Sequence, residues 1–183
     1  VDVTTVELFA SLLAVIALTG TVVYAACVAF GFDAAGIAGS VHRIALALAA
    51  SVAAVSMAGS LYFSEVADYV PCRLCWFQRI CMYPLAGILT VAAIRRDRGV
   101  RWYALPLTVV GAVISTYHYI IEWKPSLGDG ACGVGPSCTD VWFRRMGFVT
   151  LAFMALCGFI AITILLFVRP AAHETGDIER EEV

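Results

Sequence analysis

Four of the seven cysteines form two closely spaced pairs, and such pairs can carry thiol–disulfide chemistry. Two residues separate Cys72 from Cys75, an arrangement that can close a small, reducible disulfide and tends to lower a thiol pKa. Cys132 and Cys138 lie in a segment rich in glycine and proline, whose turns allow the short Cα separation of a disulfide. From its residues alone, the second pair can be either exchange-active or a static brace for its loop.

An arginine follows the first pair at a spacing of one helical turn. Cys75 is expected at the start of a helix, where unpaired backbone N–H groups and the helix dipole favour an anion. Arg79 is four residues further on and so lies on the same helical face. We predict a thiolate at Cys75 that the helix start and the Arg79 guanidinium both stabilise. The alternative is that Arg79 only anchors the helix at the lipid headgroups.

His118 lies between two tyrosines near the end of an apolar run. Aromatic residues are typical of the membrane–water interface, and His118 can belong to that belt. Because imidazole titrates near neutral pH, His118 can equally donate a hydrogen bond or relay a proton beside a bound cofactor. Arg79 and His118 are therefore the candidate cofactor-binding residues.

The cysteine spacing does not favour a metal or haem site. Structural zinc sites usually place about two to four residues between paired cysteines, whereas five residues separate Cys132 from Cys138. Trp76 follows Cys75 at the position where a covalent c-type haem site has histidine. We predict no bound metal.

The composition is that of a membrane protein. Of the 183 residues, 61% are hydrophobic and only 14% are charged, against about 25% charged in a soluble domain. This excludes an ordinary cytosolic enzyme, a disordered chain and a nucleic-acid-binding protein with a basic face. Five apolar runs are long enough to cross a bilayer as helices, over residues 8–30, 44–63, 76–94, 103–121 and 147–168.

The expected fold is an all-α integral membrane protein, a four-helix transmembrane bundle with one additional N-terminal transmembrane helix. The extra helix and its connecting loop occupy residues 1–43, the core residues 44–168 and an acidic cytoplasmic tail residues 169–183. The first run lacks a preceding basic segment and is long for a signal peptide, so we favour an uncleaved helix over a cleaved signal.

Helix parity places both cysteine loops on one side of the membrane. Two spans separate loop 64–75 from loop 122–146, and loop 95–102, with four arginines in eight residues, faces the other side. The positive-inside rule makes the arginine-rich loop cytoplasmic, although Arg144 and Arg145 oppose the rule. We therefore predict a multi-pass cell-membrane protein whose paired cysteines face the oxidising, extracytoplasmic side.

A disulfide that oxidises other thiols must pass on two electrons and two protons in each turnover. The sequence has no haem motif and no Gly-rich dinucleotide fingerprint. Cys75 and Arg79 are expected at the mouth of an apolar bundle, where a lipid-soluble carrier fits. We predict a membrane quinone (ubiquinone or menaquinone), with Arg79 stabilising negative charge on its oxygen.

The run from Pro71 to Arg79 (PCRLCWFQR), the short arginine loop and the cysteine loop leading into Asp140 to Phe143 (DVWF) resemble the DsbB/BdbC disulfide-bond formation proteins. The resemblance covers residues 44–168, and the second pair is similar to that of the BdbC-type branch. It implies a membrane disulfide oxidase in which Cys72 and Cys75 are the quinone-proximal pair, with Cys75 facing the quinone.

The resemblance also implies that Cys132 and Cys138 reoxidise a thioredoxin-fold, DsbA-like partner, whose thiolate attacks Cys132. Electrons then pass from the partner through the second pair and the first pair to the quinone. Whether a disulfide joins Cys72 to the second loop as an intermediate stays open. The first helix is extra to the family pattern, and the sequence indicates no role for it.

Two other functions fit parts of the sequence. A vitamin K epoxide reductase-like protein also couples cysteines to a quinone in a helical bundle, but the order of elements here argues against it. A non-enzymatic membrane adaptor with structural disulfides is the third possibility, and such an adaptor does not turn over with a dithiol protein.

Overall fold

The computed structural model describes residues 2–30, 35–128 and 136–168, and regular secondary structure in these ranges is helical. An isolated antiparallel bridge between Arg145 and Val149 is the exception. Short 3-10 turns cover Arg98–Val100 and Pro125–Leu127. The long helices are α1 (Val3–Ala29), α2 (Ala35–Glu65), α3 (Arg73–Arg95), α4 (Arg101–Trp123) and α5 (Leu151–Phe167).

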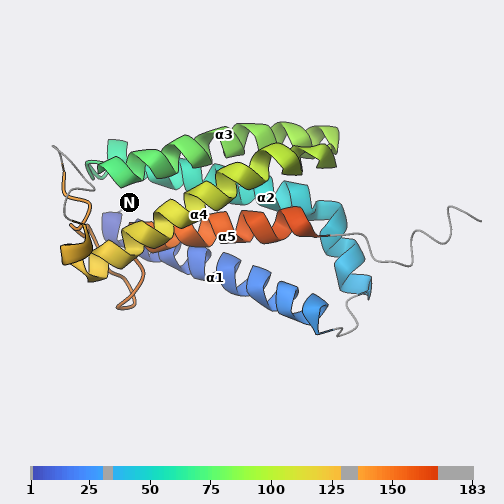
Figure 1. The fold of residues 1–183 in the computed structure, drawn as a ribbon, viewed down its shortest axis with the longest axis horizontal. Helices are drawn as coiled ribbons and strands as arrows, with labels where there is room; N and C mark the ends of the chain where they lie inside the picture. The colour runs from blue at the N-terminus through green and yellow to red at the C-terminus, as the bar shows by residue number, and fades with distance from the viewer. Residues whose placement is uncertain (1, 31–34, 129–135, 169–183) are drawn as a thin grey trace, which may run out of the picture.

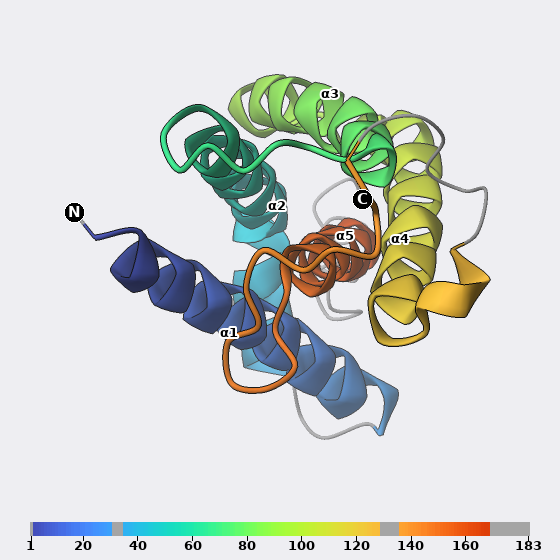
Figure 2. The same cartoon turned by 90° about the vertical axis from the view of Figure 1, so that its left-hand side faces the viewer.

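The helices form the expected bundle with one extra member. Helices α2, α3, α4 and α5 pack around a common core, and α1 packs along α5 on the outside (Figures 1 and 2). Among the described residues, α1, Ile44–Glu65, α3 and Arg98–Trp123 are long and apolar enough to span a membrane. Helix α5 has 17 residues, about 25 Å, and is apolar but shorter than the bilayer core. The all-α membrane fold is confirmed.

Three predicted boundaries are wrong. Helix α2 begins at Ala35, so the predicted connecting loop is helical from residue 35 onward, because no proline interrupts the chain between residue 35 and the apolar run. Helix α1 begins at Val3, which brings an acidic residue, Glu7, into a helix that was predicted to start at residue 8. Helix ends depend on caps and packing as well as on the edge of an apolar run.

The fifth helix starts later than the apolar run that contains it. Met146 and Gly147 have φ values of 52° and 79°, which turns the chain before the helix begins. Thr150 then caps α5, because its hydroxyl accepts a hydrogen bond from the Phe153 backbone N–H at 3.3 Å. Residues 147–150 are therefore a turn and a cap, and the run 147–168 overstates the helix.

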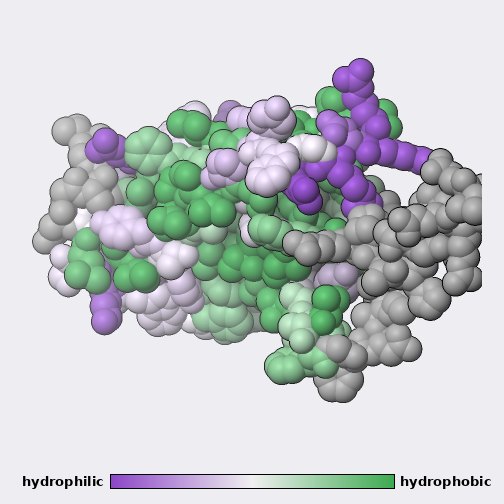
Figure 3. Space-filling model, turned by 45° about the vertical axis from the view of Figure 1, so that its right-hand side comes forward, coloured by the Kyte–Doolittle hydropathy of each residue, from purple (hydrophilic) through white to green (hydrophobic). Residues whose placement is uncertain are grey.

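The two cysteine-bearing connections lie at the same end of the bundle, as parity predicts. Figure 1 shows the α2–α3 connection and the described part of the α4–α5 segment (residues 136–150) together at one end and the α3–α4 link at the other. Figure 3 shows a broad hydrophobic surface along the helices, with hydrophilic residues gathered near the α3–α4 link. Arg95, Arg96, Arg98 and Arg101 belong to that link.

Candidate active site

Cys72 is the N-cap of α3. Its Sγ accepts a hydrogen bond from the Cys75 backbone N–H at 3.3 Å, in the way that a serine or aspartate oxygen caps a helix. Pro71 precedes it and fixes the direction from which the chain enters the helix. The sequence Pro-Cys-X-X-Cys therefore places one thiol at the positive end of the helix and the other inside its first turn.

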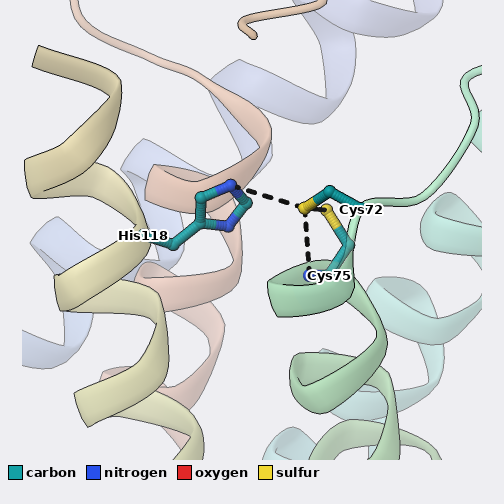
Figure 4. Close-up of side chains that lie close together, drawn as sticks. All are labelled: Cys72, Cys75 and His118. Atoms are coloured by element: carbon teal, nitrogen blue, oxygen red, sulfur yellow. Dashed lines mark hydrogen bonds between the residues drawn. The ribbon is translucent and has the colours of Figure 1, made fainter. Parts of the chain in front are cut away.

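The structure brings Cys72, Cys75 and His118 together (Figure 4). The two Sγ atoms are 2.9 Å apart, and the Cys72 Sγ lies 3.7 Å from the His118 Nε2. Both cysteines are free thiols. The hydrogen bond from the Cys75 thiol, followed by the hydrogen bond and the charge of His118, lowers the pKa of Cys72 well below its ordinary value, although burial opposes this.

The hydrogen-bond donors around the pair therefore favour a thiolate on Cys72, whereas the sequence predicted one on Cys75. Cys72 lies at the cap, where donors from the backbone, from Cys75 and from His118 all converge on its sulfur. With the thiolate on Cys72, the Cys75 thiol is the donor of the contact between the two sulfurs. Sequence spacing identified the helix start but did not reveal which of the two sulfurs accepts hydrogen bonds.

His118 is buried, with 3% of its surface exposed, and contacts Gln78 and Cys72. The Gln78 amide nitrogen lies 3.1 Å from the His118 Nδ1. An amide nitrogen only donates, so Nδ1 accepts and the ring proton of neutral His118 is on Nε2, toward Cys72. His118 is thus a hydrogen-bond donor to the reactive sulfur.

Glu122 completes the buried polar group and was not among the predicted site residues. Its Oε1 lies 4.0 Å from the His118 Nε2, and its Oε2 accepts a hydrogen bond from the Thr150 hydroxyl at 2.6 Å. Gln78 was also missed. The spacing of four residues between His118 and Glu122 puts both on one face of α4, and this signal could have identified Glu122 from the sequence.

Arg79 lies at the contact between α2 and α3, away from this group. Its Nε donates to the Ser60 Oγ and its Nη2 to the Ser60 carbonyl, both at 3.0 Å. The guanidinium carbon stands 5.3 Å from the centre of the Trp76 ring. Arg79 and His118 thus lie on different sides of the cysteine pair.

Cys138 is fully buried, in one apolar cluster with Cys72, Leu74 and Ile121. Cys138 is buried because the α4–α5 segment folds back onto the start of α3. Cys138 is disulfide-bonded, while Cys72 and Cys75 are free thiols. Cys132 lies outside the described residues.

A small cavity separates the cysteine pair from the α4–α5 segment. Its volume is about 10 Å³, which is room for about one water molecule. A quinone ring does not fit inside it. Its walls are Cys72, Cys75, His118, Glu122, Ser137, Asp140, Val141, Trp142 and Leu151.

The ligand atoms of Cys72, Cys75 and His118 lie within 4.8 Å of one another, so the reduced pair could also hold a soft metal ion. That geometry does not distinguish a metal site from a thiol pair that forms a disulfide. The absence of a bound metal stays a prediction.

Comparison with known proteins identifies the family. Residues 42–169 match the protein-family model described as "Disulfide bond formation protein DsbB". The chain belongs to the DsbB family. It is therefore a membrane disulfide oxidase, a thiol oxidoreductase. The DsbB match leaves out α1 and the first turns of α2, so the additional helix is not part of the family core.

The DsbB-family relatives include proteins of the BdbC type. Disulfide bond formation protein C of Bacillus subtilis (strain 168) is 44% identical over 116 residues, which cover 63% of this chain and 84% of that protein. A probable disulfide formation protein C of Bacillus cereus is 43% identical over 129 residues, covering 69% and 92%. That of Halalkalibacterium halodurans is 46% identical over 121 residues, covering 64% and 88%. No solved structure matches the chain.

The lowered pKa of Cys72 predicts how this thiol responds to pH. In the reduced protein, we expect the alkylation rate of Cys72 to stay nearly constant as pH falls from 9 to 6, because its thiolate persists below the ordinary thiol pKa. His118→Ala raises that pKa and makes the rate fall with pH. Cys75→Ala, which removes the largest cause, makes it fall further.

The measurement is iodoacetamide labelling followed by mass spectrometry of the Cys72 peptide across the pH range. Cys27, a free and partly buried thiol on α1, serves as the internal reference in the same samples. A Cys72 rate that rises with pH as steeply in the wild type as in His118→Ala contradicts the assignment.

Proposed function

We propose that this DsbB-family protein reoxidises an extracytoplasmic, DsbA-like dithiol protein of the thioredoxin fold. Electrons pass from that partner to Cys132 and Cys138, then to Cys72 and Cys75, and finally to a membrane quinone, ubiquinone or menaquinone. The observation that carries this proposal is the burial of Cys138 in one cluster with Cys72, beside His118. Cys138 is thus close enough to Cys72 for thiol–disulfide exchange.

The first step is attack of a partner thiolate on the Cys132–Cys138 disulfide. It forms a mixed disulfide at Cys132, and the partner's second thiol then releases the oxidised partner and leaves two thiols on the loop. Cys132 is the expected target because Cys138 has no exposed surface. The partner loses two electrons and two protons, and the second pair gains them.

The second step is exchange between the pairs. A Cys138 thiolate attacks the Cys72 sulfur of a Cys72–Cys75 disulfide, and Cys75 leaves as a thiolate. The Cys132 thiolate then attacks Cys138 and expels Cys72, which re-forms the second disulfide, and the two protons released by Cys132 and Cys138 pass to the first pair. A reduced first pair beside a re-formed disulfide at Cys138 is the product of this step. His118 donates toward Cys72 from Nε2, and the Glu122 Oε1 lies 4.0 Å from the same Nε2, where it can take or return the proton.

A bound quinone supplies the two-electron, two-proton acceptor that restores the Cys72–Cys75 disulfide. The cavity beside His118 is too small for it, so we assign its binding to the membrane-facing side of Cys75, at Arg79 and Trp76. Ser60 holds two of the five N–H donors of Arg79. The Arg79 Nη1 has no hydrogen bond among the described residues and can donate to a quinone oxygen. His118 then acts on the thiols and does not contact the quinone.

We also propose that the cysteine end of the bundle faces outward from the cell membrane and the arginine-rich link inward. Two arginines oppose that orientation, and both have contacts that hold them at this end. Arg144 stands 4.0 Å from the centre of the Trp123 ring, and Arg145 pairs with Glu7. Labelling of intact cells with an impermeant thiol reagent after reduction tests the orientation. Labelling confined to inverted membranes contradicts it.

The test of the whole proposal is turnover by the purified protein. We expect a reduced thioredoxin-fold dithiol protein to be oxidised catalytically in the presence of a water-soluble quinone analogue, with one quinone reduced for each disulfide formed. A non-enzymatic adaptor gives at most one equivalent and then stops. Oxidation that ends after one equivalent of partner contradicts the proposal.

Arg79→Ala is expected to weaken quinone use by roughly ten- to a hundred-fold at limiting quinone, since one charge-assisted contact is lost at a partly desolvated site. Arg79→Lys keeps the charge but not the planar fork and is expected to fall between. The measurement is the initial rate against quinone concentration. Ser60→Ala is the matched control, because it removes the contact of the Arg79 Nε with Ser60 but keeps the guanidinium. If Arg79→Ala turns over normally, Arg79 is only a headgroup anchor.

A further inference from the structure

The additional helix α1 lies outside the residues that match the DsbB family, yet it contacts both connections that carry the cysteines. The contact is made by Glu7, in the second turn of α1, which is 4% exposed. Ionisable residues within membrane spans are costly to bury and are retained where they have a function. The partners that compensate for the burial of Glu7 therefore indicate what α1 does.

The two carboxylate oxygens of Glu7 bind different segments. Oε1 accepts a hydrogen bond from the Tyr69 hydroxyl, in the α2–α3 connection three residues before Cys72. Oε2 accepts from the Arg145 Nε at 2.8 Å and from its Nη2, in the α4–α5 segment. In Figure 2, that segment crosses in front of α1 and α5. One side chain thus joins the two segments that close over the cysteines.

The contacts continue from Tyr69 to the cavity wall. The Tyr69 ring stacks on the Trp142 ring, with centroids 4.8 Å apart and planes 8° apart. Trp142 lines the cavity together with Cys72 and His118. Tyr69 also stacks on Phe63 at the end of α2, with centroids 5.8 Å apart. An uninterrupted series of contacts therefore leads from Glu7 on α1 to the site of thiol exchange.

Tyr69 and Arg145 both donate hydrogen bonds to the Glu7 carboxylate. Burial, followed by the hydrogen bond to Glu7, raises the pKa of Tyr69 to about 12, so its hydroxyl remains a donor throughout the physiological range. Arg145 is about one-third exposed, whereas Glu7 is almost wholly buried. Removing Arg145 therefore leaves a buried charge without its partner, which is strongly unfavourable.

We propose that Glu7 is a positioning residue, through which α1 holds the α2–α3 connection and the α4–α5 segment together over Cys72. In this arrangement Trp142 closes the cavity, and the buried Cys138 stays in the cluster that contains Cys72. The part of this inference that concerns turnover rests on the proposed function. The part that concerns the closure of the two segments does not.

The first test measures closure without any activity. In the reduced protein, we expect Glu7→Gln to increase the labelling rate of Cys72 by a bulky maleimide about tenfold, because the segments over it open more often. Glu65→Gln is the matched control, since Glu65 is an exposed acid at the end of α2. Tyr69→Phe keeps the ring stack and loses only the hydroxyl contact, so a smaller increase in the same direction is expected.

The second test separates positioning from general stability. We expect Glu7→Gln to lower kcat about tenfold with a thioredoxin-fold dithiol protein, with KM for the quinone unchanged. Quinone reduction driven by a small dithiol, which acts directly on Cys72 and Cys75, should not fall below its wild-type rate. A variant that merely unfolds loses both activities and its thermal transition.

The outcomes are distinguishable. If the wild type oxidises no thioredoxin-fold dithiol, the proposed function fails, and the maleimide rates still decide the inference about α1. If Glu7→Gln labels Cys72 and turns over like the wild type, the inference is overturned. If Glu7→Gln does not fold, Tyr69→Phe decides, because it leaves the pair of Glu7 and Arg145 intact. Wild-type labelling of Cys72 in Tyr69→Phe then overturns the inference.

Discussion

Cys72→Ser and Cys75→Ser are each expected to abolish quinone reduction, by about 10³-fold or more, while the protein stays folded. The loss is chemical, because a single remaining thiol cannot form the disulfide that passes two electrons on. The fold is expected to survive for two reasons. Serine is a good N-cap, so it can replace the Cys72 sulfur at the start of α3. A disulfide that closes so short a loop stabilises a protein little.

The measurement is the initial rate of quinone reduction, with the thermal transition recorded on the same preparations. Cys27→Ser is the matched control, because Cys27 is a free thiol on α1, in a helix outside the family match. It should retain the wild-type rate. Normal quinone turnover by either Cys72→Ser or Cys75→Ser refutes the assignment of this pair.

The second large effect separates the two cysteine pairs by function. Cys138→Ser and Cys132→Ser are both expected to abolish oxidation of the protein partner. Both should spare quinone-dependent reoxidation after a small dithiol reduces the Cys72–Cys75 pair. The reason is access, because a folded partner that reached directly for Cys75 at the start of a membrane helix would clash with the bilayer.

The two variants of the second pair should differ in one respect. In Cys138→Ser, incubation with an oxidised partner leaves a mixed disulfide at Cys132 that its missing neighbour cannot resolve, so a covalent adduct is expected on a non-reducing gel. In Cys132→Ser, the remaining thiol has no exposed surface, so the adduct should be at least about tenfold weaker.

Two other outcomes would contradict these assignments. If the adduct forms through Cys72 while Cys132 and Cys138 are dispensable, electron flow runs in a different order and the second pair is only a brace. Equal adducts from both variants contradict the claim that burial of Cys138 directs the partner to Cys132.

Much of the architecture could be predicted from local features of the sequence. Apolar runs of sufficient length predict membrane helices, because a span needs about 20 such residues whatever surrounds it. Because two of these helices separate the loop that carries Cys72 from the loop that carries Cys138, both loops are predicted at the same end of the bundle, as observed. The Pro-Cys-X-X-Cys motif predicts a thiol pair at a helix start, because proline and cap preferences act within a few residues.

The location of the thiolate could not be predicted in this way. The sequence favoured Cys75, because Arg79 is its neighbour on the same helix. In the structure, Arg79 turns to Ser60 on α2, and His118 reaches Cys72 from α4. Which sulfur is stabilised thus depends on two helices that approach from elsewhere in the chain.

The role of the first helix was likewise a matter of tertiary structure. From the sequence alone, the first membrane helix was predicted to start at residue 8, so Glu7 was placed outside it. The partners of Glu7 are 62 and 138 residues away along the chain. Periodicity and spacing report the contacts that a residue makes within its own helix or loop, because those depend on the backbone alone. The pairing of Glu7 with Tyr69 and Arg145, and the burial of Cys138 against the start of α3, arise only when five helices and two connections pack together.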